Sequence, residues 1–149
     1  MHAYAAAGAA FLLAVLWFDL MFDVQVMRHR EETLPAGILA SISAYYRRVL
    51  IDARPMGNLV AVVMLLTLAA IVAEIAQGEG PAWMSLASLA CAAAAIGLAG
   101  ARTVRNAAAL GRQDGSAQSQ SRLARMVFRD HVFDLVAMGA VLALQLAGA

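Results

Sequence analysis

Residues 55–76 read PMGNLVAVVMLLTLAAIVAEIA, an apolar run with a single charged side chain, Glu74. About 20 apolar residues are what an α-helix needs to cross the hydrocarbon core of a bilayer. Pro55 suits the first turn of such a helix, because an N–H at that position would lack a partner in any case. The stretch therefore predicts a membrane-spanning helix at about residues 56–76.

Apolar runs on either side of this stretch predict three more spans. They cover about residues 3–27, 83–101 and 126–147. No basic segment precedes the first run, and Arg28 and Arg30 follow it, which is the reverse of the order in a cleaved signal peptide. The expected fold is all-α, an integral membrane four-helix bundle that forms a single membrane domain over residues 1–149.

The composition of the whole chain supports a membrane location. Of its 149 residues, 62% are hydrophobic and 14% are charged, whereas an average soluble domain has about 25% charged residues. The formal net charge is +1 and the basic residues form no concentrated face, so we expect no nucleic-acid partner. The lipid bilayer is the first partner that the sequence predicts.

The placement of arginine predicts the orientation of the spans. Five arginines lie between the first and second spans and five between the third and fourth, while the turn at residues 77–81 has none. Because positive charge accumulates on the cytoplasmic side, both long connections should be cytoplasmic. We therefore expect a multi-pass protein of a bacterial inner membrane with both termini on the non-cytoplasmic side.

The two long connections differ in kind. Within residues 34–50, apolar residues recur at spacings of four and three, which predicts an amphipathic helix on the cytoplasmic interface. They are Leu34, Ile38, Ile42, Tyr45 and Val49. This helix could be an anchor packed under the bundle or a lid over a lateral entrance. Residues 111–121, GRQDGSAQSQS, offer nothing to bury and predict a flexible loop.

Ionisable side chains gather at one depth, in the cytoplasmic half of the predicted bundle. At about 1.5 Å of rise per residue, Asp23 and Asp19 lie about 6 and 12 Å inside the first span. Asp130 and Asp134 lie at similar depths in the fourth. The remaining members are Asn58 in the second span and Arg102, Arg105 and Asn106 at the end of the third. Spacings of three and four put these groups on common helix faces, and their cost in hydrocarbon favours mutual contact or a wet cavity.

Three interpretations of this polar layer stay open. The first is an ion-pair network that only fixes helix register, and the second is a path for protons or small ions. The third is a pocket in which His131 acts as a general base and Arg102 or Arg105 stabilises a phenolate or enolate. Its catalytic residues would be His131, Asp134 and Arg102, and its substrate-binding residues Asp19, Asp23, Asn58, Arg105, Asn106 and Asp130.

A metal site is a further alternative for the polar layer. His131 and Asp134 have, in reverse order, the carboxylate–histidine spacing of helical bundles that bind paired metals. However, only one histidine is embedded in a span, and nearby arginines would repel a cation. We therefore predict no metal, and the sequence identifies no cofactor. Glu74, near the outer end of the second span, is expected to reach the interface.

Small residues line one side of the third predicted span. They are Ala87, Ala90, Ala94, Gly97 and Ala101. Such a face lets two helix backbones approach closely, so it predicts a helix contact. In a homo-oligomer or a larger membrane complex, that contact would make the protein a non-catalytic accessory subunit.

The order of these features resembles a known family. The segments VMRHR, AYYRR, PMGNL, RTVRNAAAL and FRDHVFDL, in this order, are similar to the anthrone-oxygenase-like family of small four-helix integral membrane proteins. The resemblance covers nearly the whole chain and implies a pocket lined by Asn106 and His131. It also implies an oxidoreductase that oxidises reduced aromatic polyketides with O2 and without a well-defined cofactor. The pocket interpretation above would accordingly hold a flat apolar molecule such as a phenol, quinone or polyketide. The chain departs from the pattern at Asp19 and Asp23, where small or aromatic residues are usual.

Overall fold

The computed structural model describes residues 1–149, apart from the side chain of Arg54. All its regular elements are helices, and no strand occurs in this part of the chain, so the all-α class is confirmed. In chain order they are α1 (His2–Asp23), the 3-10 helix η1 (Val24–Arg28), α2 (Ala36–Tyr46), the π-helix η2 (Arg47–Asp52), α3 (Arg54–Gln77), α4 (Ala82–Leu98), the π-helix η3 (Ala99–Thr103), α5 (Val104–Arg112) and α6 (Ala117–Ala147).

Three helices are long and apolar enough to cross a membrane, and they correspond to three of the predicted spans. They are His2–Arg28, Pro55–Gln77 and Ala82–Arg112. The last is longer than predicted, because the helix continues through η3 into α5. α6 is not among the three; its N-terminal half carries Arg122, Arg125 and Arg129 before the apolar part begins. The chain is thus a membrane protein with three candidate spans, and a fourth crossing stays a prediction.

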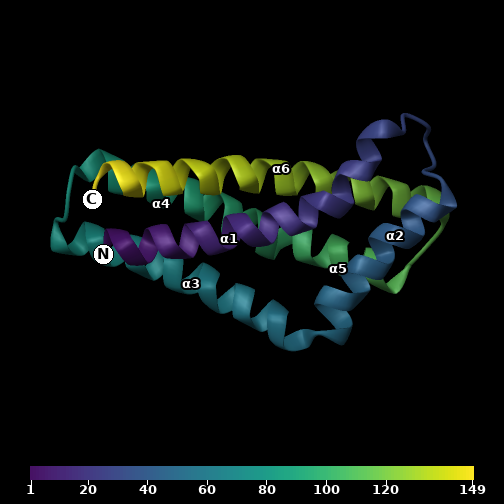
Figure 1. Ribbon diagram of the computed structural model, residues 1–149, viewed down its shortest axis with the longest axis horizontal. Helices are drawn as coiled ribbons and strands as arrows, with labels where there is room; N and C mark the ends of the chain where they lie inside the picture. The colour runs from purple at the N-terminus through teal and green to yellow at the C-terminus, as the bar shows by residue number, and fades with distance from the viewer.

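The long helices lie along one another, with both chain termini at the same end (Figure 1). α1 packs against α6 and α3, and α4 packs against α6 and α3. α3 leans away from α1 as it approaches the opposite end, where α2 and α5 lie (Figure 1).

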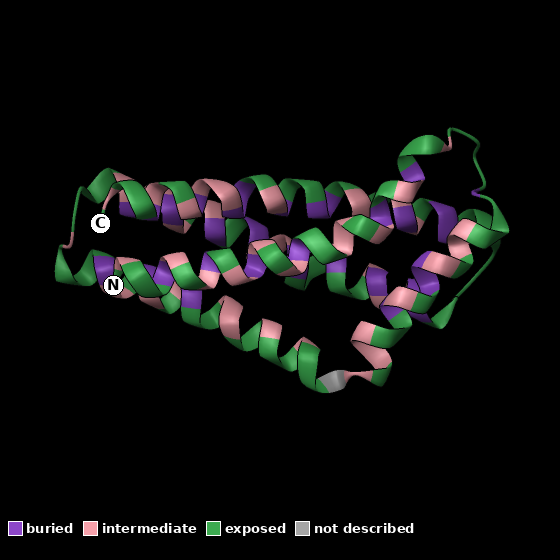
Figure 2. Cartoon of the chain, viewed as in Figure 1, coloured by how far each residue is buried: buried purple, intermediate pink, exposed green. Residues whose placement is uncertain are grey.

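Apolar side chains occupy both the inside and the outside of the bundle. One buried cluster, which includes Ala9, Leu12, Ile71 and Val141, fills the space between α1, α3, α4 and α6. Exposed residues also follow the outer faces of the long helices (Figure 2), and many of them are large and apolar. Trp17, for example, is 63% exposed. Such an apolar exterior is suited to lipid rather than to water.

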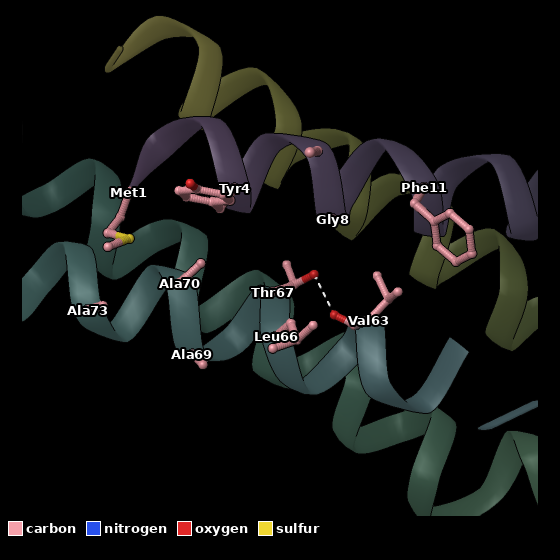
Figure 3. Close-up of a pocket in the computed structure, with 11 residues that line it drawn as sticks. Met1, Tyr4, Gly8, Phe11, Val63, Leu66, Thr67, Ala69, Ala70 and Ala73 are labelled. Atoms are coloured by element: carbon pink, nitrogen blue, oxygen red, sulfur yellow. Dashed lines mark hydrogen bonds between the residues drawn. The ribbon is translucent and has the colours of Figure 1, made fainter. Parts of the chain in front are cut away.

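α1 approaches α3 closely at Gly8, which faces Thr67 (Figure 3). A methyl group on Gly8 would collide with the Thr67 hydroxyl. That hydroxyl donates its hydrogen bond to the carbonyl of Val63, at 2.7 Å. A shallow cavity of about 660 Å³ lies along this crossing, and Thr67 contributes one of its few polar atoms. It offers little for the specific recognition of a polar group.

The predicted helix over residues 34–50 is present as α2 and η2. Its apolar stripe faces the molecule, since Leu34 and Ile42 are buried and belong to a second apolar cluster with Leu110 and Val127. A Cβ on Gly111 would lie 2.7 Å from the backbone nitrogen of Arg47. The glycine therefore lets α5 approach the end of α2 closely.

The loop predicted at residues 111–121 is wrong in its extent. α5 ends at Arg112 and α6 begins at Ala117, so only residues 113–116 connect them. The hydroxyl of Ser116 caps α6 by accepting a hydrogen bond from the backbone of Ser119, at 3.2 Å. Ser121 is buried and accepts a hydrogen bond from the backbone of Leu34, at 2.9 Å. Ser116 thus has a local partner within α6, and Ser121 has a partner in the segment before α2. The composition of the stretch alone indicates neither contact.

The small-residue face predicted to carry a helix contact points away from the bundle. Ala90, Ala94 and Gly97 are exposed, whereas Ser88, Ala92 and Ala95 form the buried side of α4. Within this chain, α4 therefore uses a different face to contact its neighbours.

Candidate functional site

A cavity of about 800 Å³ opens where α3 diverges from the other helices. Its walls come from α1, α2, η2, α3, α4, η3, α5 and α6, and most of them are apolar. The polar lining residues are Asp19, Tyr45, Tyr46, Asn58, Thr103, His131 and Asp134. A concave, mostly apolar site with a few polar groups is the usual form of a small-molecule pocket, and this volume lies within the usual range of about 300–1,000 Å³.

Asp19 receives a hydrogen bond from the adjacent helix α2. The hydroxyl of Tyr45 donates to its Oδ1, at 2.7 Å. The ring of Tyr45 stacks on Phe22, with 4.1 Å between the ring centroids. Burial and the charge of Asp19 raise the pKa of Tyr45 well above its usual range, so its phenol stays protonated and continues to donate.

Asp23 is fully buried and binds two side chains from other helices. The hydroxyl of Tyr46 donates to its two carboxylate oxygens, at 2.7 and 2.8 Å. The Nδ1 of His131 lies 2.7 Å from Asp23 Oδ2, and because a carboxylate only accepts, this nitrogen donates. Burial and the nearby carboxylates also hold the pKa of Tyr46 well above its usual range.

The imidazole of His131 lies between two carboxylates of α1. Its Nε2 is 3.9 Å from Asp19 Oδ2, while its Nδ1 binds Asp23. We call this group the cavity-end cluster: Asp19, Asp23, Tyr45, Tyr46 and His131. It joins α1, α2 and α6 at the polar end of the cavity, and only Asp23 in it does not line the cavity wall.

Asp134 is placed differently from the aspartates of α1. It lines the cavity and is only 4% exposed. Its Oδ1 is buried and has no hydrogen-bond partner in the part of the chain that the structure describes. A buried carboxylate oxygen without a partner carries a large desolvation cost. Asp134 therefore has an unused capacity to accept hydrogen bonds at the cavity wall.

Asp130 and Arg102 form a separate pair outside the cavity, and Arg105 and Asn106 also lie outside it. Arg102 donates through Nε to Asp130 at 3.0 Å, and the hydroxyl of Thr103 donates to the same carboxylate at 3.0 Å. The side chain of Arg102 is 47% exposed and does not line the cavity. Arg105 is exposed, and Asn106 is half-buried with an unpartnered Nδ2; neither lines the cavity.

The predicted polar layer therefore divides into two groups. His131, Asp134, Asp19 and Asn58 meet at the cavity, with Asp23 directly behind His131. Arg102 and Asp130 meet beside it, and Thr103, which also lines the cavity, donates to Asp130. Arg102 makes its ion pair with Asp130 alone among the described residues. A single ion-pair network over the whole polar layer, the first of the three interpretations, is therefore not what Arg102 forms.

Tyr45 and Tyr46 are site residues that the sequence analysis missed. Tyr45 was assigned to the apolar stripe of its helix, and Tyr46 was given no role. Two adjacent tyrosines beside a predicted layer of buried carboxylates are a usable signal, because a buried phenol needs a hydrogen-bond partner. Here that partner is a carboxylate for each of them.

A second group of buried polar residues lies at the opposite end of the bundle, beside the termini. Glu74 is fully buried and accepts a hydrogen bond from the hydroxyl of Ser85. His2 Nδ1 lies 3.3 Å from Glu74 Oε2 and 3.1 Å from Gln145 Oε1. We call these four residues the termini-end cluster. The expectation that Glu74 reaches the interface is wrong, because its side chain points toward α4 and α1 instead of outward.

Among the described side chains, no group of three or more His, Cys, Asp or Glu is placed to hold a metal ion. No protein-family model, no curated protein and no solved structure matches the chain. The chemistry of the cavity must therefore be inferred from its own residues.

Proposed function

We propose that the protein binds an apolar small molecule with one polar group in the 800 Å³ cavity. The observation that carries the proposal is the unequal distribution of polar atoms on the cavity wall. Residues such as Leu12, Met64 and Met138 provide an apolar surface, while the polar side chains gather around His131 and Asp134. Such a wall would hold the body of a ligand by burial and orient it by its polar group.

We also propose that the ligand enters from the bilayer. Phe18 and Met56 line the cavity and are 59% and 51% exposed on the outside of the bundle. An opening bordered by such residues faces lipid in a membrane protein. Tyr45, Val49 and Leu50 close another side of the cavity, which favours a lid over an anchor as the role of residues 34–50.

The proposed topology has four crossings, with both termini non-cytoplasmic and α2 at the cytoplasmic interface. The position of both termini at one end of the molecule supports an even number of crossings (Figure 1). α6 packs along α1, and a Cβ on Gly148 after α6 would lie 3.2 Å from His2 at the start of α1. α6 therefore extends along the same length of the bundle as the first candidate span.

Oxidation of the bound molecule is a second candidate function, favoured by the pairing of His131 with Asp23. A carboxylate that holds Nδ1 orients an imidazole and supports its use as a base. Anthrone and O2 would give anthraquinone and water, as the family resemblance implies. However, the Arg102 guanidinium that would stabilise the enolate pairs with Asp130 outside the cavity, so binding is the function that the geometry supports better.

A pair of tryptophan substitutions in α3 tests the proposed site. Ala61 lines the 800 Å³ cavity, and Ala69, two turns later in the same helix and equally exposed, lines the shallow cavity beside α1. We expect Ala61→Trp to weaken binding of naphthylmethanol by about tenfold or more, because the indole fills the cavity. Ala69→Trp should bind as the wild type does. Equal affinity of all three proteins in lipid nanodiscs would contradict the proposal.

Oxidation has a separate test. Purified protein supplied with anthrone would consume O2 and form anthraquinone, and His131→Gln would lose that activity while it still binds naphthylmethanol. If wild-type protein consumes no more O2 than empty nanodiscs do, the oxidation candidate is wrong and binding stands alone.

A further inference from the structure

The charges around the cavity are unbalanced. Asp19, Asp23 and Asp134 supply three carboxylates at its polar end, and His131 supplies one imidazole. Arg102 does not correct the balance, because it pairs with Asp130 and does not line the cavity. With the three carboxylates ionised and His131 protonated, the described side chains at this end carry more negative than positive charge.

Among these three carboxylates, Asp134 is the one that lines the cavity without a donor from the described part of the protein. Asp19 has Tyr45 as a donor, and Asp23 has Tyr46 and His131. Asp134 Oδ1, by contrast, is buried, unpartnered among the described residues and part of a side chain on the cavity wall. A ligand that brings N–H donors and positive charge would satisfy this oxygen and offset the cost of its burial.

The aromatic residues of the cavity wall independently favour a positively charged ligand. Phe18, Tyr45 and Tyr46 all line the cavity. The face of an aromatic ring attracts a cation within about 6 Å of its centroid, and cation-binding pockets often combine such rings. Negatively charged groups such as carboxylates, phosphates or phenolates gain nothing from either feature.

We infer that the polar group of the ligand is a protonated amine carried on an apolar body, with its nitrogen at Asp134. This inference rests on the proposed binding function and narrows it to one class of ligand. The amine would donate hydrogen bonds to Asp134, and the apolar body would lie along the wall formed by Leu12, Val60 and Met64. The site is thus selective for lipophilic cations over neutral and anionic molecules of the same shape.

Three probes with the same ring system test the inference: naphthylmethylamine, naphthylmethanol and naphthoic acid. Their affinities would be measured with purified protein in nanodiscs of zwitterionic lipid, with empty nanodiscs subtracting partition into the bilayer. We expect the wild type to bind the amine about tenfold or more tightly than the alcohol, and to bind the acid most weakly. Asp134→Asn should bind the amine and the alcohol equally, with its affinity for the alcohol unchanged.

Asp114→Asn is the matched control, because Asp114 is an exposed carboxylate paired with Arg112, far from the cavity lining. It should keep the preference for the amine. If Asp134→Asn does not fold, Asp19→Asn serves in its place and should reduce the preference. Wild-type protein that binds the alcohol as tightly as the amine overturns the inference but leaves the proposed function intact. Binding of none of the three probes overturns both.

Discussion

At the end of the bundle beside the termini, the carboxylate of Glu74 is buried against Ser85 and His2. At the other end, the carboxylate of Asp23 is buried against Tyr46 and His131. Both carboxylates are fully buried, lie beside a histidine and accept a hydrogen bond from a hydroxyl, but Glu74 Oε2 has no hydrogen-bond partner among the described residues. All residues of the cavity-end cluster except Asp23 line the 800 Å³ cavity, whereas those of the termini-end cluster line neither cavity described above.

The comparison teaches that a buried ionisable group in a membrane helix does not by itself identify a binding site. The termini-end cluster holds α1, α3, α4 and α6 together, and none of its residues lines either of the two cavities. The cavity-end cluster also joins helices, but it does so at the edge of an open volume. We therefore expect the two clusters to contribute alike to stability and differently to binding.

The largest effect is expected from Asp23→Ala. The substitution leaves the imidazole of His131 and the hydroxyl of Tyr46 buried without their partner, which should cost about 3–5 kcal/mol of unfolding free energy. It should also weaken naphthylmethylamine binding, because the contacts that join α1, α2 and α6 beside Asp134 are lost. Unfolding in mixed detergent micelles would measure the stability. The control, Asp114→Ala at an exposed site, should change it by less than about 0.5 kcal/mol. A stable Asp23→Ala protein would show that the cavity-end cluster does not hold the bundle together.

The next effect compares the two tyrosines of α2. Tyr46→Phe removes a hydroxyl that donates to the fully buried Asp23, and a hydrogen bond to a charged group contributes about 1.5–3 kcal/mol. Tyr45→Phe removes an equivalent bond to Asp19, but Tyr45 is only half-buried and Asp19 faces the cavity. We expect the Tyr45→Phe loss to be about half as large. If both substitutions lower the free energy of unfolding equally, the burial of the carboxylate does not decide how much its tyrosine hydroxyl contributes.

A smaller effect is expected from Glu74→Gln in the termini-end cluster. Glutamine keeps an oxygen that accepts from Ser85, so the loss should be about 1 kcal/mol. Affinity for naphthylmethylamine should not change, which distinguishes this cluster from the cavity-end cluster. A weaker affinity, measured beside wild type in the same nanodiscs, would mean that the two clusters are coupled and that the termini-end cluster also contributes to binding.

The smallest effect on the fold is expected from reporter insertions that assign each end of the bundle to a side of the membrane. Gly80 and Gly115 lie in turns with positive φ angles of 71° and 91°, outside the helices. A reporter at Gly80, beside the termini, should read non-cytoplasmic, and one at Gly115 should read cytoplasmic. The opposite pattern would reverse the orientation, and the same reading at both sites would remove one of the proposed crossings.

Much of the fold could be predicted from the sequence because hydrophobicity alone decides it. Long apolar runs predicted the three candidate spans, and the spacing of Asp19, Asp23, His131 and Asp134 predicted that they share an interior. Spacing along one helix does not say which neighbour that face will meet. For this reason Arg102 was expected at the catalytic centre but pairs with Asp130 beside it, and Glu74 was expected at the interface but points inward.

Other features depended on tertiary contacts that local composition does not encode. The Ser- and Gln-rich stretch after Gly115 has the composition of a loop, yet Ser116 caps a helix and Ser121 binds the backbone of Leu34. Tyr46 has no partner nearby in the sequence, and its hydroxyl donates to Asp23 on another helix. For Ser121 and Tyr46, a partner far away in the sequence decides the role of the side chain.

The two π-helices, η2 and η3, both border the cavity, through Val49 and Leu50 in one and Ala99 and Thr103 in the other. A π turn holds more residues than an α turn, and such turns are frequent at functional sites. Because a π turn is an α-helix that has accommodated one extra residue, loss of one residue from η3 would restore α geometry there while α4 and α5 keep their places. A homologue could thus change the cavity wall at Ala99 and Thr103 by a single-codon deletion, with the rest of the helix in place.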